Sequence, residues 1–109
     1  MNRGKLPTDP TVIVCVPTYN NGESIRSTLD ILCSQSRPPD RIVVCDKSED
    51  RTPEVIRSAA NETEVSIEMI RQTGDGVAAA YDQLLDYVSG EYDLFLTLQT
   101  NIRVPNNWL

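Results

Sequence analysis

The sequence has 109 residues, of which 39% are hydrophobic, and a formal net charge of −6. This length fits one domain and leaves no room for two cores, and no apolar run approaches the ~20 residues that a membrane-spanning helix needs. The acidic surface repels phosphate backbones, which argues against nucleic acid as a partner. We therefore expect one cytoplasmic domain without a membrane span over residues 11–109, after a flexible leader of residues 1–10.

The first half of the chain predicts two pairs of a strand and a helix. Residues 11–16 form a continuous apolar, β-branched run, which is typical of a strand buried on both faces, and residues 41–46 repeat this pattern. Between them, apolar residues at helical spacing predict a helix from about residue 23 to residue 34. A second helix, about residues 52–61, is predicted to begin with Thr52 as its N-cap, followed by a proline and an acid.

The second half predicts a third pair and a last strand. Residues 65–70 alternate apolar and polar side chains, which indicates a half-exposed strand near a sheet edge. A long helix follows over about residues 76–89, and Gly90 ends it. The apolar face expected for this helix consists of Val77, Tyr81, Leu84, Leu85 and Val88. Residues 93–99 predict the fourth strand, and residues 101–109 begin a new turn or helix.

This order predicts an α/β fold, with a Rossmann-like, mainly parallel sheet flanked by helices on both faces. In such sheets, ligands bind beyond the carboxyl ends of the strands. The predicted ends lie at residues 17–21, 46–52, 71–76 and 99–103, where nearly all of the polar residues of interest are found.

Several common kinds of site do not fit this sequence. Neither the glycine fingerprint of nicotinamide-binding domains nor the Walker motif follows the first strand, and that strand does not end in the clustered acids of a receiver domain. The absence of histidine removes His-based acid–base chemistry and His-ligated metals. Cys15, Cys33 and Cys45 are too few and too irregularly spaced for a disulfide framework or a zinc site, so we expect buried thiols.

Two groups of residues at the strand ends are candidates for ligand binding. Pro17, Thr18, Tyr19 and Asn20 bring a ring, a hydroxyl and an amide to a turn stiffened by proline. This set can stack on a planar ring and bind its edge, although a turn with a helix cap explains the same residues. Asp46 can accept a hydrogen bond from a nucleobase imide or a ribose hydroxyl, or it can cap the turn that follows.

These residues resemble the family-2 glycosyltransferases. The resemblance rests on residues 14–20, 42–52, 76–80, 90–92 and 103–109, which occur in the order and spacing of that family and include its Pro-Thr-Tyr-Asn and Asp-x-Ser-x-Asp blocks. It covers almost the whole chain from Thr11. Members have the GT-A fold and transfer a sugar from a nucleotide-sugar donor with inversion, so the resemblance implies that fold and that ligand class, with UDP the usual nucleotide.

The resemblance also implies roles for single residues. Thr18 and Tyr19 match positions that line the base pocket, and Asp46 matches the carboxylate that reads the imide edge of the base. Ser48 and Asp50 match the loop beside it. The residues that the resemblance and the turn chemistry together assign to the nucleotide are Pro17, Thr18, Tyr19, Asn20, Asp46, Ser48, Asp50 and Gly76.

Two departures from the family concern the diphosphate. The family holds Mn²⁺ or Mg²⁺ with an Asp-x-Asp motif after the fourth strand, and the matching positions here are Gln99, Thr100 and Asn101, whose neutral groups are poor ligands for these cations. The family's Ala-Arg-Asn block is Ala-Tyr-Asp here, at residues 80–82, which removes an arginine that would face the donor. We therefore expect the metal ligands to be lost and the nucleotide sugar to bind weakly.

The family's acceptor half follows its metal motif and supplies the general base. This sequence ends at Leu109, so we expect a GT-A-like domain cut after its fourth strand that transfers little or no sugar alone. The alternative is a non-catalytic GT-A-like module that binds a nucleotide or a partner. A sheet edge left open after the fourth strand also predicts a homo-oligomer.

Overall fold

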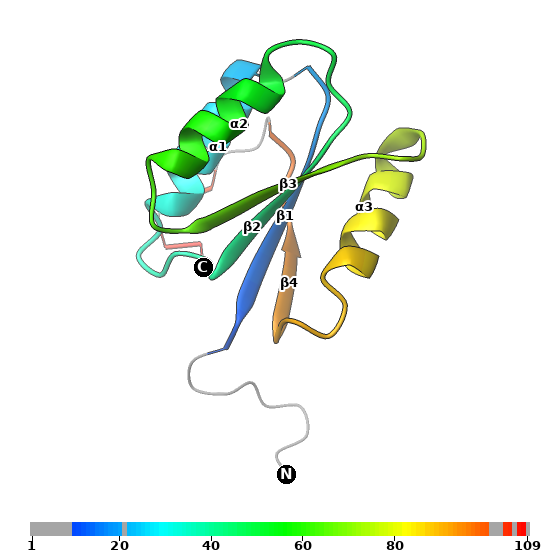
Figure 1. Ribbon diagram of the computed structural model, residues 1–109. Coiled ribbons are helices and arrows are strands. Elements are labelled where there is room, and N and C mark those ends of the chain that lie inside the picture. The colour runs from blue at the N-terminus through cyan, green and yellow to red at the C-terminus, as the bar shows by residue number, and fades with distance from the viewer. Residues whose placement is uncertain (1–9, 21, 101–103, 106, 109) are drawn as a thin grey trace.

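The computed structural model describes residues 10–20, 22–100, 104–105 and 107–108, so the predicted leader lies outside the described residues except for Pro10. Within the described part of the chain, strands and helices alternate (Figure 1). The elements are β1 (Val12–Thr18), α1 (Gly22–Cys33), β2 (Arg41–Asp46), α2 (Thr52–Asn61), β3 (Ser66–Arg71), α3 (Gly76–Tyr87) and β4 (Leu94–Thr97).

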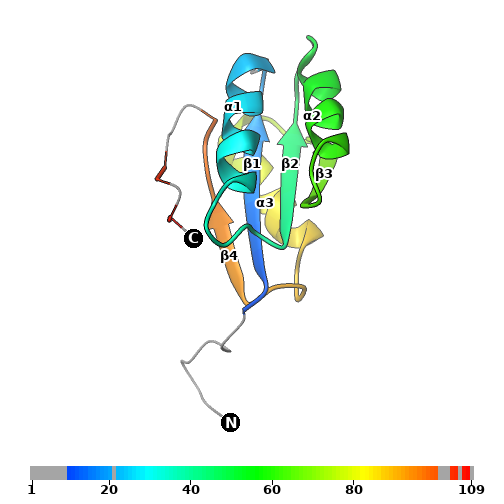
Figure 2. The ribbon, with the colours of Figure 1, turned by 90° about the vertical axis from the view of Figure 1, so that its left-hand side faces the viewer.

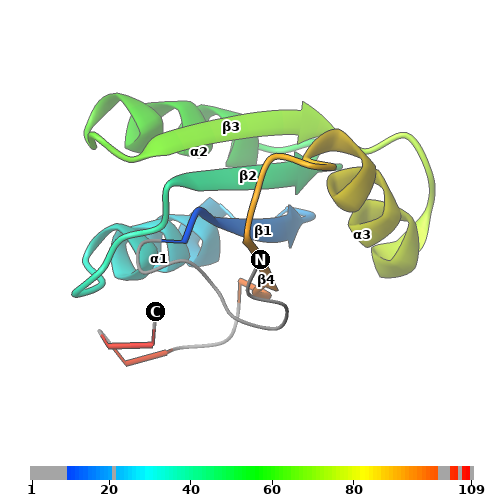
Figure 3. The ribbon, with the colours of Figure 1, turned by 90° about the horizontal axis from the view of Figure 1, so that it is seen from below.

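Among the described residues, four strands form one parallel sheet in the order β3-β2-β1-β4 (Figure 3). α1 and α2 cover one face of this sheet, and α3 covers the other (Figure 2). Right-handed crossovers require this arrangement, because the chain moves from β1 through β2 to β3 and then returns past β1 to β4. The switch point beside which such sheets bind ligands therefore lies between β1 and β4. The predicted α/β fold is confirmed.

The central strands β1 and β2 are buried on both faces, which explains their continuous apolar runs. Successive side chains of a strand point to opposite faces, so each strand contributes to two cores. The core under α1 and α2 consists of Val12, Val14, Val16, Ile25, Leu29, Leu32, Ile42, Val44, Ile56, Ala59 and Leu98. The core under α3 consists of Ile13, Cys15, Val43, Cys45, Ala80, Leu84 and Val88.

Most predicted elements agree with the structure. β2 and α2 have the predicted bounds, and β3 is an edge strand whose side chains are partly exposed, as its alternating sequence predicts. β4 is shorter than predicted, since it ends at Thr97. The turn or helix predicted for residues 101–109 lies partly outside the described residues. In its described part, the Trp108 N–H donates to the Pro105 carbonyl oxygen at 3.1 Å.

The predicted apolar face of α3 is wrong in part. Leu84 and Val88 are buried together with Ala80, whereas Val77 and Leu85 are exposed. The buried residues are spaced by four and form a narrow stripe against the sheet. In the described part of the chain, α3 is the one helix on this face, so the neighbouring stripe of the helix has no element to cover it.

The predicted N-cap of α2 is also wrong. α2 begins at Thr52 itself, and Arg51 before it makes no side-chain capping bond. Instead, Asp50 Oδ1 accepts hydrogen bonds from the Thr52 hydroxyl at 2.6 Å and from the Thr52 backbone N–H at 2.9 Å. These bonds hold the pKa of Asp50 below its usual value. Asp50 therefore fixes the start of the helix from outside it.

The remaining general predictions concern thiols, membranes and assembly. Cys15 and Cys45 are buried free thiols, as predicted, and Cys33 is a half-buried free thiol. None of the helices in the described ranges is long and apolar enough to span a bilayer. β3 and β4 form the two edges of the sheet, and association of copies through such an edge stays a prediction.

Candidate functional site

A cavity of about 600 Å³ opens at the carboxyl ends of the four strands, next to the first turns of α3. Residues at or just past the end of every strand contribute to it, as expected for a ligand site at the switch point of a parallel sheet. We call it the strand-end cavity. The residues that line it are Pro17, Thr18, Tyr19, Lys47, Gln72, Gly76, Val77, Ala80, Gln99 and Thr100.

The turn after β1 brings Tyr19 and Asn20 to this end of the sheet. Tyr19 is 58% exposed, so its ring presents an open aromatic surface at the cavity. Asn20 has a φ of 50°, in the left-handed region that asparagine tolerates better than most residues. Its backbone N–H donates to Ser48 Oγ at 2.7 Å, and its Oδ1 accepts from the Glu49 N–H at 3.0 Å. The turn is thereby joined to the loop after β2.

Asp46, the last residue of β2, lies behind this turn with no exposed surface. Its Oδ1 accepts hydrogen bonds from the hydroxyls of Thr18 and Ser48, each at 2.6 Å. Its Oδ2 accepts from Arg71 Nη1 at 2.7 Å, and the same nitrogen donates to the Ser48 carbonyl oxygen at 3.1 Å. A buried carboxylate needs such donors to offset its loss of hydration. The network holds the ends of three neighbouring strands together.

Sequence reasoning missed Arg71, which completes this network. The parallel register of β2 and β3 pairs Arg71 directly with Asp46. The signal that could have indicated this contact was a basic residue just after the third predicted strand. Gln83 of α3 supports the same segment: its Nε2 donates to the Arg71 carbonyl oxygen at 2.6 Å, and its Oε1 accepts from the Thr73 N–H at 2.9 Å. This helical glutamine gave no signal in the sequence.

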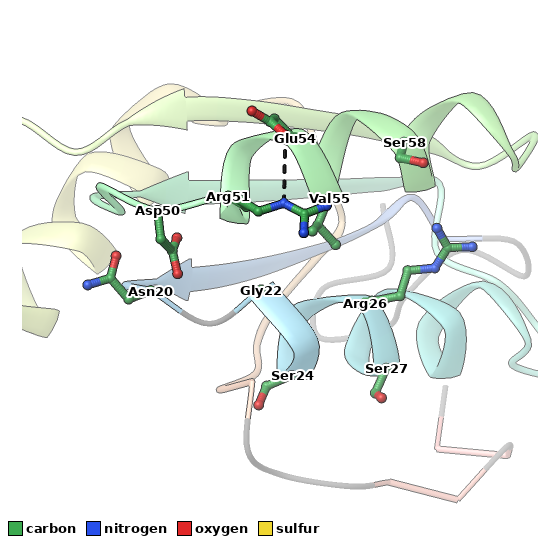
Figure 4. A pocket seen from close by; sticks show the side chains of 10 residues that line it. All are labelled: Asn20, Gly22, Ser24, Arg26, Ser27, Asp50, Arg51, Glu54, Val55 and Ser58. Atoms are coloured by element: carbon green, nitrogen blue, oxygen red, sulfur yellow. Dashed lines mark ion pairs between the residues drawn. The ribbon is translucent and has the colours of Figure 1, made fainter.

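A second cavity, of about 990 Å³, lies between α1 and α2 (Figure 4). Asn20 and Asp50 line this cavity and not the strand-end cavity. Arg51 and Glu54 at its rim form an ion pair of 3.9 Å, drawn in Figure 4. Two of the predicted nucleotide-binding residues therefore line a different cavity, although Asn20 remains hydrogen-bonded to Ser48.

The other predicted residues are gathered at the strand-end cavity. Pro17, Thr18, Tyr19 and Gly76 line it, whereas Asp46 and Ser48 stand behind Thr18 through their hydrogen bonds. Gly76 has a φ of 85°, a conformation that L side chains rarely adopt, which explains glycine at the start of α3.

Comparison with known proteins assigns the chain to a family. Residues 13–98 match the family described as Glycosyl transferase family 2. The chain belongs to this family. Comparison with curated proteins gives no match.

Solved structures of glycosyltransferases share the fold. A mannosyltransferase from Pyrobaculum calidifontis, in complex with GDP-Man and Mn²⁺, has a TM-score of 0.80 and 29% identity, over 92% of this chain and 30% of its own. Mannosyl-3-phosphoglycerate synthase from Rubrobacter xylanophilus has a TM-score of 0.71 and 21% identity, over 88% of this chain and 32% of its own. Glucosyl-3-phosphoglycerate synthase from Mycobacterium tuberculosis, in complex with Mn²⁺, UDP and glucosyl-3-phosphoglycerate, has a TM-score of 0.62 and 16% identity, over 88% and 35%. The fold is thus of the GT-A type, and the chain spans about a third of the length of these proteins.

The donor set of this glycosyl transferase domain does not fit a divalent cation. Of the three residues that the resemblance matches to the family's metal motif, Gln99 and Thr100 line the strand-end cavity with a neutral amide and hydroxyl, and Asn101 lies outside the described residues. The described residues contain no group of three or more Asp, Glu, Cys or His side chains that could hold a metal ion. Mn²⁺ and Mg²⁺ prefer anionic oxygen ligands, which the described lining residues do not supply.

Proposed function

We propose that this domain binds the nucleotide part of a nucleotide-diphosphate sugar, of the UDP type, in the strand-end cavity, as a step of inverting sugar transfer. The observation that carries the proposal is the pair of Asp46 and Arg71, an acceptor and a donor held together behind Thr18 and beside Gln72, both of which line the cavity. Membership of the glycosyl transferase family supports the ligand class. The similar mannosyltransferase from Pyrobaculum calidifontis was solved with GDP-Man, which supports it further.

Arg71 has the chemistry to read one edge of a base. Asp46 has no exposed surface and its carboxylate already accepts from Thr18, Ser48 and Arg71, so a base reaches the pair through Arg71. The side chain of Arg71 is 57% exposed and has further N–H groups that can donate to a carbonyl oxygen of a base. Uracil and guanine have a carbonyl oxygen on their pairing edge where cytosine and adenine have an amino group, which cannot accept a hydrogen bond from Arg71.

Tyr19 supplies the second element of base binding. Tyr19 lines the cavity and is 58% exposed, so a base can stack on its ring, and stacking contributes to affinity for every base without selecting among them. We therefore assign affinity to Tyr19 and selectivity to Arg71, which Asp46 holds in place.

Isothermal titration with UDP, GDP, CDP and ADP tests the proposal. We expect UDP and GDP to bind at least about tenfold more tightly than CDP and ADP, since a mismatched edge leaves buried polar groups unpaired. Arg71→Gln should remove this preference, and Arg57→Gln, on the exposed side of α2, is the matched control. Equal affinity for all four nucleotides, or no binding of any, would contradict the proposal.

One observation favours the non-catalytic alternative for this chain. Transfer needs a group that takes a proton from the acceptor hydroxyl, and none of the described residues lining the strand-end cavity is a carboxylate. We therefore expect the chain alone to release no UDP from a UDP-sugar beyond the rate without protein. Repeated turnover of the donor by the purified chain would rule out this alternative.

A further inference from the structure

The strand-end cavity contains one charged side chain among the described residues that line it, that of Lys47. Lys47 directly follows β2, and its side chain is 35% exposed. The other lining residues are apolar or carry neutral hydroxyl and amide groups. In a chain with a net charge of −6, Lys47 makes this cavity a local site for an anion.

The ammonium group of Lys47 is held by acceptors from the loop before α3. Its Nζ donates to the Gly74 carbonyl oxygen at 3.0 Å and to the carboxylate of Asp75. The side chain of Asp75 is almost fully exposed, and its hydrogen bond with Lys47 lowers its pKa, so Asp75 stays ionised at neutral pH. Exposed ion pairs contribute little to stability because water and salt screen them. An anion of higher charge that enters the cavity can therefore replace Asp75.

A nucleoside diphosphate needs a positive partner, and in this cavity the candidate for that partner is a lysine ammonium group rather than a metal ion. By the resemblance, Gln99 and Asn101 match the two carboxylates of the family's metal motif, and the described residues that line the cavity do not fit a divalent cation. A lysine ammonium binds phosphate oxygens as a compact charge with three N–H donors, on a stem flexible enough to change partners. Lys47 is the group in the described lining that can take this part.

We propose that Lys47 leaves Asp75 and binds the diphosphate of the donor, so that the site recognises a nucleoside diphosphate without a divalent cation. This inference rests on the proposed function and adds the residue that distinguishes a diphosphate from a nucleoside. Asp75 competes with the ligand for the same ammonium group, and the Gly74 carbonyl oxygen keeps Lys47 near the cavity in both states.

The experiment compares uridine with UDP, in EDTA and in Mn²⁺, by isothermal titration. Three variants are compared with the wild type. Lys47→Gln keeps an N–H donor for Gly74 but loses the charge, whereas Lys47→Arg keeps the charge. Asp75→Asn removes the competing carboxylate. In EDTA we expect the wild type to bind UDP about tenfold more tightly than uridine, in line with one charge-assisted contact, and this preference should weaken as salt is raised. Thermal unfolding of each variant checks that the fold is kept.

Each outcome decides between the two proposals. Lys47→Gln should reduce the affinity for UDP to that for uridine and leave uridine binding unchanged. Lys47→Arg should retain most of the preference for UDP over uridine. Asp75→Asn should increase the affinity for UDP several-fold. An unchanged preference in Lys47→Gln, or a preference that appears only with Mn²⁺, would overturn the assignment of Lys47 while the proposed function stands. If neither uridine nor UDP binds the wild type, the proposed function falls, and this inference with it.

Discussion

Arg71 Nη1 lies 2.7 Å from Asp46 Oδ2, and the two residues are direct partners in the register of β2 and β3. The carboxylate is fully buried, whereas more than half of the guanidinium side chain is exposed. The pair therefore joins the interior of the sheet to its exposed surface at the strand ends. The same contact stabilises the strand ends and forms the proposed base-reading edge.

The first prediction concerns the stability of this network. Asp46→Ala should lower the free energy of unfolding by about 2–4 kcal/mol, because the hydroxyls of Thr18 and Ser48 and the Arg71 guanidinium lose a common acceptor. Arg71→Gln should cost less, about 1 kcal/mol, since its side chain is largely solvated. Urea denaturation measures both. Equal losses in the two variants would contradict the view that the buried carboxylate is the centre of the network.

The second prediction concerns pH. Arg41 Nε and Nη2 donate to the two carboxylate oxygens of Glu68 at 2.6 and 3.0 Å, and the Tyr87 hydroxyl adds a bond of 3.0 Å. The contact with Arg41, followed by that with Tyr87, holds the pKa of Glu68 below its usual value. A lowered folded-state pKa gives stability that is present above the unfolded value of about 4.3 and is lost as the pH falls through the folded value.

Glu68→Gln should therefore be less stable than the wild type by about 1 kcal/mol at pH 7, and this difference should shrink as the pH falls below the unfolded value of about 4.3. Urea denaturation at a series of pH values measures it. Glu64→Gln, at an exposed position before β3, is the matched control for the loss of one carboxylate. A difference that stays constant as the pH falls through this range would indicate a packing effect rather than the ion pair.

The third prediction concerns the thiols. Burial raises the pKa of Cys15 to about 12, and burial also raises the pKa values of Cys33 and Cys45. A raised pKa lowers the thiolate fraction, and the thiolate is the reactive form. At pH 8 an alkylating reagent should modify the half-buried Cys33 first, and Cys15 and Cys45 only in urea. Mass spectrometry of peptides checks this order, and rapid modification of Cys15 in the native protein would contradict it.

The sequence predicts the parts of the fold whose signals are local. The β-branched run at residues 41–46 and the Thr-Pro-Glu start at residue 52 gave the bounds of β2 and α2, because each signal lies within the element that it defines. The alternation around Ile67 likewise identified an edge strand. The start of α2 was misread in one respect, since the side chain that fixes Thr52 is that of Asp50, outside the helix.

The site could be predicted less fully because it depends on contacts between strands. Pro17, Thr18 and Tyr19 could be predicted because they are consecutive in the sequence, at the end of β1 and the start of the turn that follows it. Arg71 reaches Asp46 only through the register of two strands that are separated by a helix in the sequence. Lys47 lines the cavity only because the ends of the four strands come together there, which the local sequence around residue 47 does not indicate.

The last prediction tests which face of α3 packs on the sheet. Leu84 and Leu85 are adjacent and equally apolar, so periodicity alone did not separate them, yet Leu84 is fully buried and Leu85 is 46% exposed. Leu84→Ala should lower the free energy of unfolding by about 2–5 kcal/mol, because it leaves a cavity in the core. Leu85→Ala should change it by less than about 1 kcal/mol, because alanine is a strong helix former and little buried surface is lost. Urea denaturation of the two variants compares them directly. If Leu85→Ala proved as costly as Leu84→Ala, a further surface would have to cover this stripe of α3 in solution.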